Sequence, residues 1–272
     1  MKSILLYADS GSAFESRFQA ALDLSRAYDG HITFIQATPL SGFIVMDPMG
    51  GSYVPTAMLE QLRTDEERLR KMVEARMMVE DMPWDWTAYD GDVTQAVISA
   101  SRLADIIVLS LDNTANKVRA HPLLSMADVA VDTRCAVLGV PTTAKSLNTC
   151  GKVLVAWDGG HEAANALRAA LPMLQMAESV HLVSIIEPRK DAGFPSVEAS
   201  AYLSRHGVAS ELIERERGAL SIEETIEAVA GEIGADLIVM GAFGHSRLRE
   251  TLLGGVTRYF LRDSTIPLFL AH

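Results

Sequence analysis

The sequence contains only two cysteines, Cys135 and Cys150, among its 272 residues. Two cysteines cannot build a disulfide framework, and the seven histidines show no spacing typical of metal ligands. No apolar stretch reaches the ~18 residues that a membrane-spanning helix needs. The opening MKSILLYADSG is interrupted by Asp9 and lacks a small-residue cleavage site, so we interpret it as a strand rather than a signal peptide. These absences predict ordinary thiols, no metal site and a location in the reducing cytoplasm.

Positive charge is also scarce. The chain has 24 lysines and arginines against 35 aspartates and glutamates, a formal net charge of −11. A protein that binds nucleic acid or an anionic membrane normally presents a basic face, so neither partner is expected. The basic groupings near a suggestive loop are HSRLR at residues 245–249 and the pair Arg258 and Arg262.

An internal repeat divides the sequence. Residues 4–39 align without a gap on residues 153–188, and a second block, 104–110, aligns on 235–241. Identity is sparse, but both first strands are followed by an aspartate, Asp9 or Asp158. A repeat of this length predicts duplicated domains, which we place at residues 1–145 and 150–272 with a polar linker between them.

Each predicted domain alternates short apolar strands with helical segments. Continuously apolar strands of this kind are typical of a parallel sheet covered on both faces. The predicted fold class is therefore α/β, with two tandem doubly wound, Rossmann-like parallel-sheet domains of about five strands each. Ligands of such folds bind at the carboxyl ends of the strands. We expect the last strands, 135–140 and 266–271, to pair edge to edge and make a pseudo-dimer within one chain. Association of two chains into a homodimer stays open.

The first half carries extra residues, a loop followed by a long charged helix around residues 41–81. Seven of the twelve methionines lie between Met46 and Met82. Methionine clusters can form an adaptable binding surface, although packing of a helix on its own domain is the commoner cause.

Glycines gather after one apolar strand of the second half. The run ADLIVM ends at Gly241, Gly244 follows, and Gly254 and Gly255 precede the helical segment VTRYFLRDS. A strand end, a glycine-rich backbone and a helix N-terminus together make an anion site, because free N–H groups and the helix dipole favour a phosphate. Tight turns are the alternative explanation, and spacing alone does not choose between them.

Neither the P-loop pattern nor the G-x-G-x-x-G dinucleotide fingerprint occurs in the chain. The pattern present, G-x2-G-x9-G after a strand with an aspartate closing the first strand, resembles that of the universal stress protein family. The resemblance covers nearly the whole chain as two tandem domains. It implies an adenine-nucleotide-binding, adenine nucleotide alpha hydrolase-like fold that dimerises through its last strand, acts in stress tolerance and has no established turnover.

The resemblance also implies the site residues. Asp158 would face the nucleoside, the backbone near Val183 would meet adenine, and the glycine loop would hold the phosphates. The predicted nucleotide-binding residues are Asp158, Gly159, Val183, Gly241, Gly244, His245, Gly254, Gly255 and Val256. The implied ligand is ATP or another adenine nucleotide, with or without Mg²⁺, acting as a ligand and not as a catalytic cofactor.

The chain departs from the family pattern in two places. Gly255 stands where ATP-binding members have Ser or Thr, and a lost hydrogen bond to a charged group is worth about 1.5–3 kcal/mol. In the first half, Ser110, Asn113 and Leu123 replace the three glycines. We therefore predict at most one nucleotide site, in the second half, and expect Asp9 to cap a turn.

The leading hypothesis is a cytoplasmic stress-response protein whose second domain binds ATP or a related adenine nucleotide as a regulatory ligand. The alternative is a protein-interaction module of the same fold that binds no nucleotide, with an unknown protein partner. Enzymatic turnover ranks last, at most weak ATP hydrolysis, because no catalytic set can be placed from the sequence.

Overall fold

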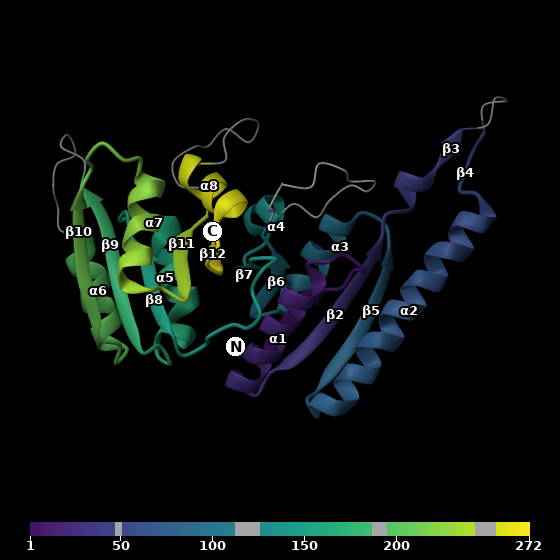
Figure 1. Cartoon of the computed structure of the whole chain (residues 1–272), viewed down its shortest axis with the longest axis horizontal. Coiled ribbons are helices and arrows are strands. Elements are labelled where there is room, and N and C mark those ends of the chain that lie inside the picture. The colour runs from purple at the N-terminus through teal and green to yellow at the C-terminus, as the bar shows by residue number, and fades with distance from the viewer. Residues whose placement is uncertain (47–50, 112–125, 187–194, 243–253) are drawn as a thin grey trace.

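The computed structural model describes residues 1–46, 51–111, 126–186, 195–242 and 254–272 (Figure 1). The main-sheet strands of the first half are β1 (Ser3–Tyr7), β2 (His31–Thr38), β5 (Trp84–Asp90), β6 (Ile106–Ser110) and β7 (Ala136–Val140). Its helices are α1 (Phe14–Tyr28), α2 (Thr56–Glu80), α3 (Val93–Ala100) and α4 (Met126–Asp132), with 3-10 turns η1 (Leu40–Phe43) and η2 (Ser101–Leu103). A small ribbon is formed by β3 (Val45–Met46) and β4 (Ser52–Tyr53).

The second half has the same kinds of element. Its strands are β8 (Lys152–Ala156), β9 (Ser179–Ile186), β10 (Ser210–Glu216), β11 (Leu237–Gly241) and β12 (Leu268–Ala271). Its helices are α5 (His161–Leu174), α6 (Pro195–Arg205), α7 (Ile222–Ile233) and α8 (Gly255–Asp263).

One sheet of ten strands runs through both halves, in the order β10-β9-β8-β11-β12-β7-β6-β1-β2-β5. Strands within each half are parallel, and the second half repeats the strand order of the first. The halves join where β12 pairs antiparallel with β7, with Phe269 opposite Leu138. The predicted α/β class with doubly wound parallel strands is confirmed, and the joint leaves β5 and β10 as the outer strands.

The apolar runs form strands because both faces of the sheet are covered. In β6, Ile106 and Val108 enter one core, while Ile107 and Leu109 enter the other. Each of these four side chains is at most 1% exposed. A strand buried on both faces has no polar side to show, which is why its sequence does not alternate.

Helix α7, which borders the candidate site, begins and ends at signals in its local sequence. Ser221 and Glu224 form a reciprocal capping box at its start, and Gly234 ends it in the left-handed region at φ 66°. The hydrogen bond from the Ser221 backbone lowers the pKa of the Glu224 carboxyl. Among the described residues, no helix is both long and apolar enough to cross a membrane.

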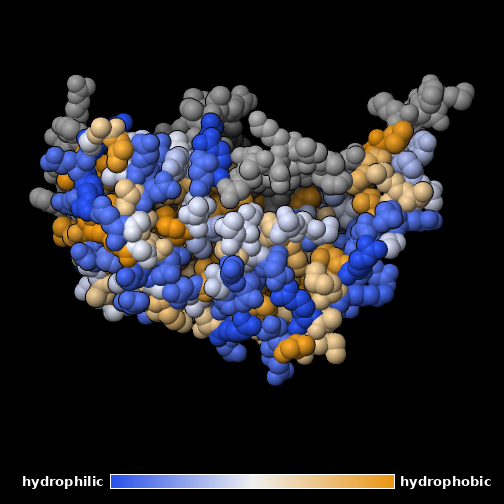
Figure 2. All heavy atoms as spheres, viewed as in Figure 1, coloured by the Kyte–Doolittle hydropathy of each residue, from blue (hydrophilic) through white to orange (hydrophobic). Residues whose placement is uncertain are grey.

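Helix α2 and the β3–β4 ribbon extend past the edge of the sheet beside β5 (Figure 1). Near the ribbon, Ile44, Val45 and Tyr53 are about half exposed, and Figure 2 shows apolar surface there. The methionines of α2 divide by position, since Met77 is buried in the core and Met78 is 83% exposed. Packing on its own domain thus accounts for part of the methionine cluster.

Candidate functional site

The predicted site lies at the carboxyl edge of β8 and β11. These strands pair directly, with Val239 opposite Val155, so the loops that follow them leave from the same edge of the sheet. Seven of the nine predicted residues are described. Gly244 and His245 lie outside the described residues.

The turn after β8 is built by the predicted aspartate and glycine. Asp158 is exposed, and its Oδ1 accepts a hydrogen bond from the Gly160 backbone N–H at 2.8 Å. Gly159 has φ 78°, a conformation that favours glycine. Asp158 therefore shapes the entry to α5 while presenting its negative charge at the strand end.

Gly241 closes β11 against the first turn of α5. A Cβ added there would lie 2.6 Å from the backbone nitrogen of Ala163 and 2.6 Å from the carbonyl carbon of Glu162. At the aligned position the first half has Ser110. Close approach of the α5 backbone accounts for glycine at position 241 without a ligand, and the place of Gly241 in the nucleotide site stays a prediction.

Gly254 and Gly255 lie at the start of α8 and differ from Gly241 in the space around them. A Cβ at either position would meet no described atom within 4 Å. Gly254 has φ −52° and ψ 137°, which any residue can adopt, and it provides no side-chain cap. Within the part of the chain that the structure describes, neither local packing nor backbone conformation accounts for these two glycines.

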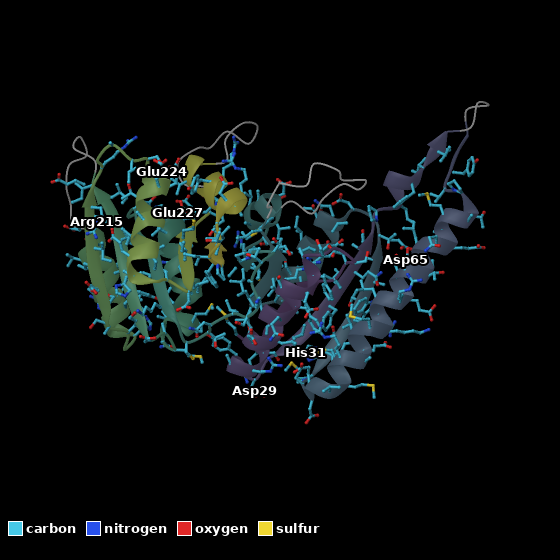
Figure 3. The ribbon with its side chains drawn as sticks, viewed as in Figure 1. Asp29, His31, Asp65, Arg215, Glu224 and Glu227 are labelled. Carbon is cyan, nitrogen blue, oxygen red and sulfur yellow. The ribbon has the colours of Figure 1, made fainter. Side chains whose placement is uncertain are left out.

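The N–H groups at the start of α8 are available to a ligand. The first turn of a helix has no intrahelical acceptors for its N–H groups, and here these belong to Gly255, the half-buried Val256 and their neighbours. The helix is anchored, because Phe260 is 1% exposed and the Tyr259 hydroxyl donates to Glu227 Oε2 on α7 at 2.5 Å. Figure 3 shows Glu224 and Glu227 on α7 near α8.

Val183 lies in the sheet rather than on its rim. Its side chain is 1% exposed, and its carbonyl accepts a hydrogen bond from the Trp157 backbone N–H at 2.8 Å. The Ser184 hydroxyl donates to the Trp157 carbonyl at 3.0 Å, which ties β9 to the end of β8. The Val183 carbonyl is therefore engaged within the sheet, and the exposed end of β9 begins beyond it, toward Ile186.

The corresponding edge of the first half is filled by an arginine that sequence reasoning missed. Arg17 on α1 is 3% exposed, and its Nη2 lies 2.7 Å from Asp9 Oδ1. Its Nε donates to the Tyr7 carbonyl at 2.8 Å and its Nη1 to Ser110 Oγ at 2.9 Å. The guanidinium thus bonds the ends of β1 and β6 together.

A signal for Arg17 existed in the repeat. The residue aligned with it in the second half is Ala166, and Ser110 aligns with Gly241. The first half has polar side chains at these two positions, where the second half has alanine and glycine. Asp9 does accept the Gly11 N–H at 2.8 Å, as a turn cap would, but it is also the partner of Arg17.

Comparisons with known proteins indicate which family the chain resembles in sequence. Residues 150–272 match the sequence profile of the Universal stress protein family. A universal stress protein of Synechocystis sp. is 28% identical over 174 residues, which cover 60% of this chain. The match spans 56% of that relative, a little over half of its length.

Solved structures show the same fold over nearly the whole chain. A universal stress protein from Archaeoglobus fulgidus has a TM-score of 0.76 at 18% identity, covering 98% of this chain and 97% of its own. A functionally unknown protein from Pseudomonas aeruginosa has a TM-score of 0.59 at 17% identity, covering 100% and 92% respectively. The second half therefore matches the Universal stress protein family in sequence, and the chain as a whole shares the fold of a solved universal stress protein.

Proposed function

We propose that the second half binds ATP or a related adenine nucleotide as a regulatory ligand in a stress-response protein. The phosphates would lie at the start of α8, and Asp158 would face the nucleoside. The observation that carries the proposal is that α8 begins with two glycines that neither packing against the described residues nor backbone conformation requires. The match of the second half to the family supplies the expectation that the ligand is an adenine nucleotide.

The start of α8 suits a phosphate for three reasons. Its N–H groups lack intrahelical acceptors, the helix dipole places partial positive charge there, and the absent side chains allow close approach. Such a dipole contribution is worth about 0.3–1 kcal/mol at an exposed site. The packing of Phe260 and the Tyr259–Glu227 hydrogen bond hold the helix before any ligand arrives.

The same reasoning supports one site per chain. In the first half, the Arg17 guanidinium fills the edge between Asp9 and Ser110. A nucleotide there would have to displace a buried ion pair and two hydrogen bonds. We therefore expect a stoichiometry of one nucleotide per chain.

Calorimetric titration with ATP and Mg²⁺ tests the proposal through a matched pair of variants. Gly254→Asp places a carboxylate in open space at the start of α8, where it would repel phosphate. Gly231→Asp places the same group in open space on the exposed surface of α7. We expect the first variant to lose binding and the second to retain it; equal binding by both, or no binding by the wild-type protein, would refute the proposal.

A second candidate function is a protein-interaction module that binds no nucleotide. The exposed apolar surface of Ile44, Val45 and Tyr53 favours it, together with the missing hydroxyl at Gly255. Nucleotide absorbance in the spectrum of the protein as purified would count against this function and for the first.

A further inference from the structure

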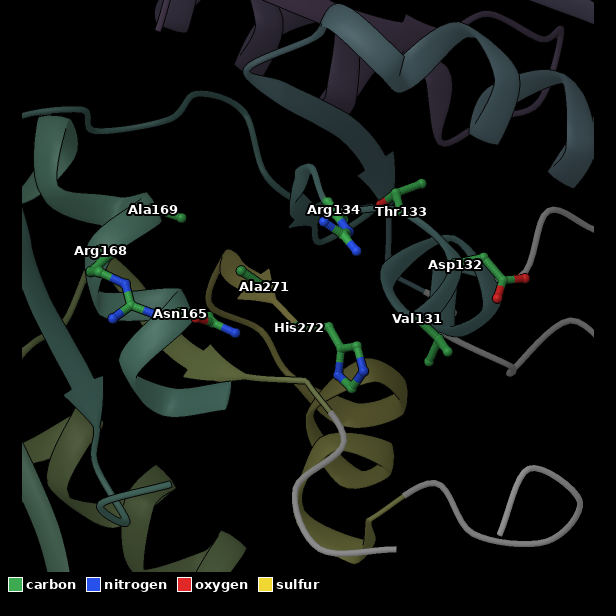
Figure 4. Close-up of a pocket in the computed structure, with 9 residues that line it drawn as sticks. All are labelled: Val131, Asp132, Thr133, Arg134, Asn165, Arg168, Ala169, Ala271 and His272. Atoms are coloured by element: carbon green, nitrogen blue, oxygen red, sulfur yellow. Dashed lines mark hydrogen bonds between the residues drawn. The ribbon is translucent and has the colours of Figure 1, made fainter. Parts of the chain in front are cut away.

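A groove of about 680 Å³ lies where the two halves of the molecule meet (Figure 4). One side is formed by the end of α4 and the residues that lead from it into β7, and the other by α5 and the end of β12. The groove is therefore lined by both halves, beside the β7–β12 joint.

Two arginines from different halves extend into this groove. Arg134 comes from the first half and Arg168 from α5 of the second, both are exposed, and Figure 4 shows their guanidinium groups directed into the space. Within the described ranges, neither has a carboxylate at ion-pair distance. Asp132 is the acidic side chain of the lining, and its carboxylate points away from both arginines (Figure 4).

The amide beside them adds hydrogen-bond donors rather than acceptors. Asn165 Oδ1 accepts a hydrogen bond from Arg168 Nη2. With its oxygen so engaged, Asn165 directs its NH2 group toward His272 across the groove (Figure 4). Arg134, Arg168 and the Asn165 NH2 group thus supply hydrogen-bond donors to the groove, which is the chemistry that receives an oxyanion.

We propose that this groove binds a small multivalent oxyanion of the phosphate or pyrophosphate class, held between Arg134 and Arg168. Guanidinium groups bind phosphate oxygens through paired, charge-assisted hydrogen bonds. An anion here pairs with two cations that have no carboxylate at ion-pair distance among the described residues, in a chain of net charge −11. Because the arginines belong to different halves, the bound anion also strengthens the joint between β7 and β12.

Calorimetric titration with sodium pyrophosphate at constant ionic strength tests the site. We expect one pyrophosphate per chain in the groove, and about a tenfold or greater loss of affinity in Arg134→Gln and in Arg168→Gln. Arg102→Gln removes an exposed arginine from η2, outside the groove, and should leave the affinity unchanged. At several times Kd, pyrophosphate should raise Tm of the wild type by about 2–4 °C but not that of the double variant.

Two further binding measurements distinguish this site from the proposed nucleotide site at the start of α8. Gly254→Asp should retain pyrophosphate binding, because the groove does not include α8. Binding that is lost in Gly254→Asp but kept in the Arg134→Gln, Arg168→Gln double variant would overturn the proposal. So would absence of binding to the wild type, or citrate binding as tightly as pyrophosphate, which would remove the assignment to phosphate chemistry.

Discussion

Restoring a hydroxyl at the start of α8 should tighten ATP binding. The change is Gly255→Ser, at the position where ATP-binding members of the family have Ser or Thr. A Cβ at Gly255 meets no described atom within 4 Å, so none of the described residues obstructs the new side chain. Its hydroxyl would stand at the first helical residue, beside the N–H groups proposed to hold the phosphates.

The size of the effect follows from the bond that is gained. A hydrogen bond to a charged group contributes about 1.5–3 kcal/mol, and every 1.4 kcal/mol is a tenfold change in Kd. Gly255→Ser should therefore lower Kd for ATP by about tenfold to a hundredfold. Gly255→Ala is the matched control, because it adds the same Cβ without the hydroxyl.

Isothermal titration of the wild type and both variants with ATP and Mg²⁺ measures the difference. We expect Gly255→Ala to raise Tm slightly with Kd close to that of the wild type, and Gly255→Ser alone to bind more tightly. If Ser and Ala variants bind ATP equally, the hydroxyl does not reach the phosphates and the placement of the nucleotide on α8 is refuted.

Three further predictions concern stability and reactivity. Arg17→Met should lower the free energy of unfolding in urea by about 3 kcal/mol, because it removes a buried guanidinium that pairs with the partly exposed Asp9 and donates two hydrogen bonds. Arg26→Met, which breaks half-exposed pairs, should cost under about 1 kcal/mol, and equal losses would contradict the role of burial. Gly241→Ala should cost about 1–3 kcal/mol in the same assay, since its Cβ would overlap the α5 backbone, and an unchanged midpoint would show that α5 can shift freely. Burial raises the pKa of the Cys135 thiol to about 12, so at neutral pH a thiol-specific colour reagent should label the exposed Cys150 quickly and Cys135 only after unfolding; two fast thiols would refute this.

Much of the architecture was predictable because buried parallel strands read as continuous apolar runs. Ile106–Ser110 and Leu237–Gly241 were both placed as strands from such runs, and the repeat that relates them indicated two similar halves. The start of α8 was predictable for a similar reason, since a glycine pair before a helical segment is a local signal. These features depend on residues that are neighbours in the chain, and a sequence shows neighbours directly.

Contacts between distant segments were not predictable in this way. The β3–β4 ribbon was unexpected because two-residue strands carry no periodicity. The reason for glycine at position 241 is the approach of α5, whose closeness to β11 depends on how the helix packs over the sheet. A glycine can be required by a bound ligand or by close packing, and the sequence looks the same in both cases. Only the position of α5 relative to β11 distinguishes the two explanations.

The sequence by itself determined the fold class, the order of the strands along the chain and the glycines at the start of α8. Tertiary structure decided that Arg17 fills the edge of the first half and that Arg134 and Arg168 line one groove. The physical reason is that burial and local conformation leave a periodic pattern in the chain. The meeting of side chains far apart in sequence depends on packing distances, which no local pattern records.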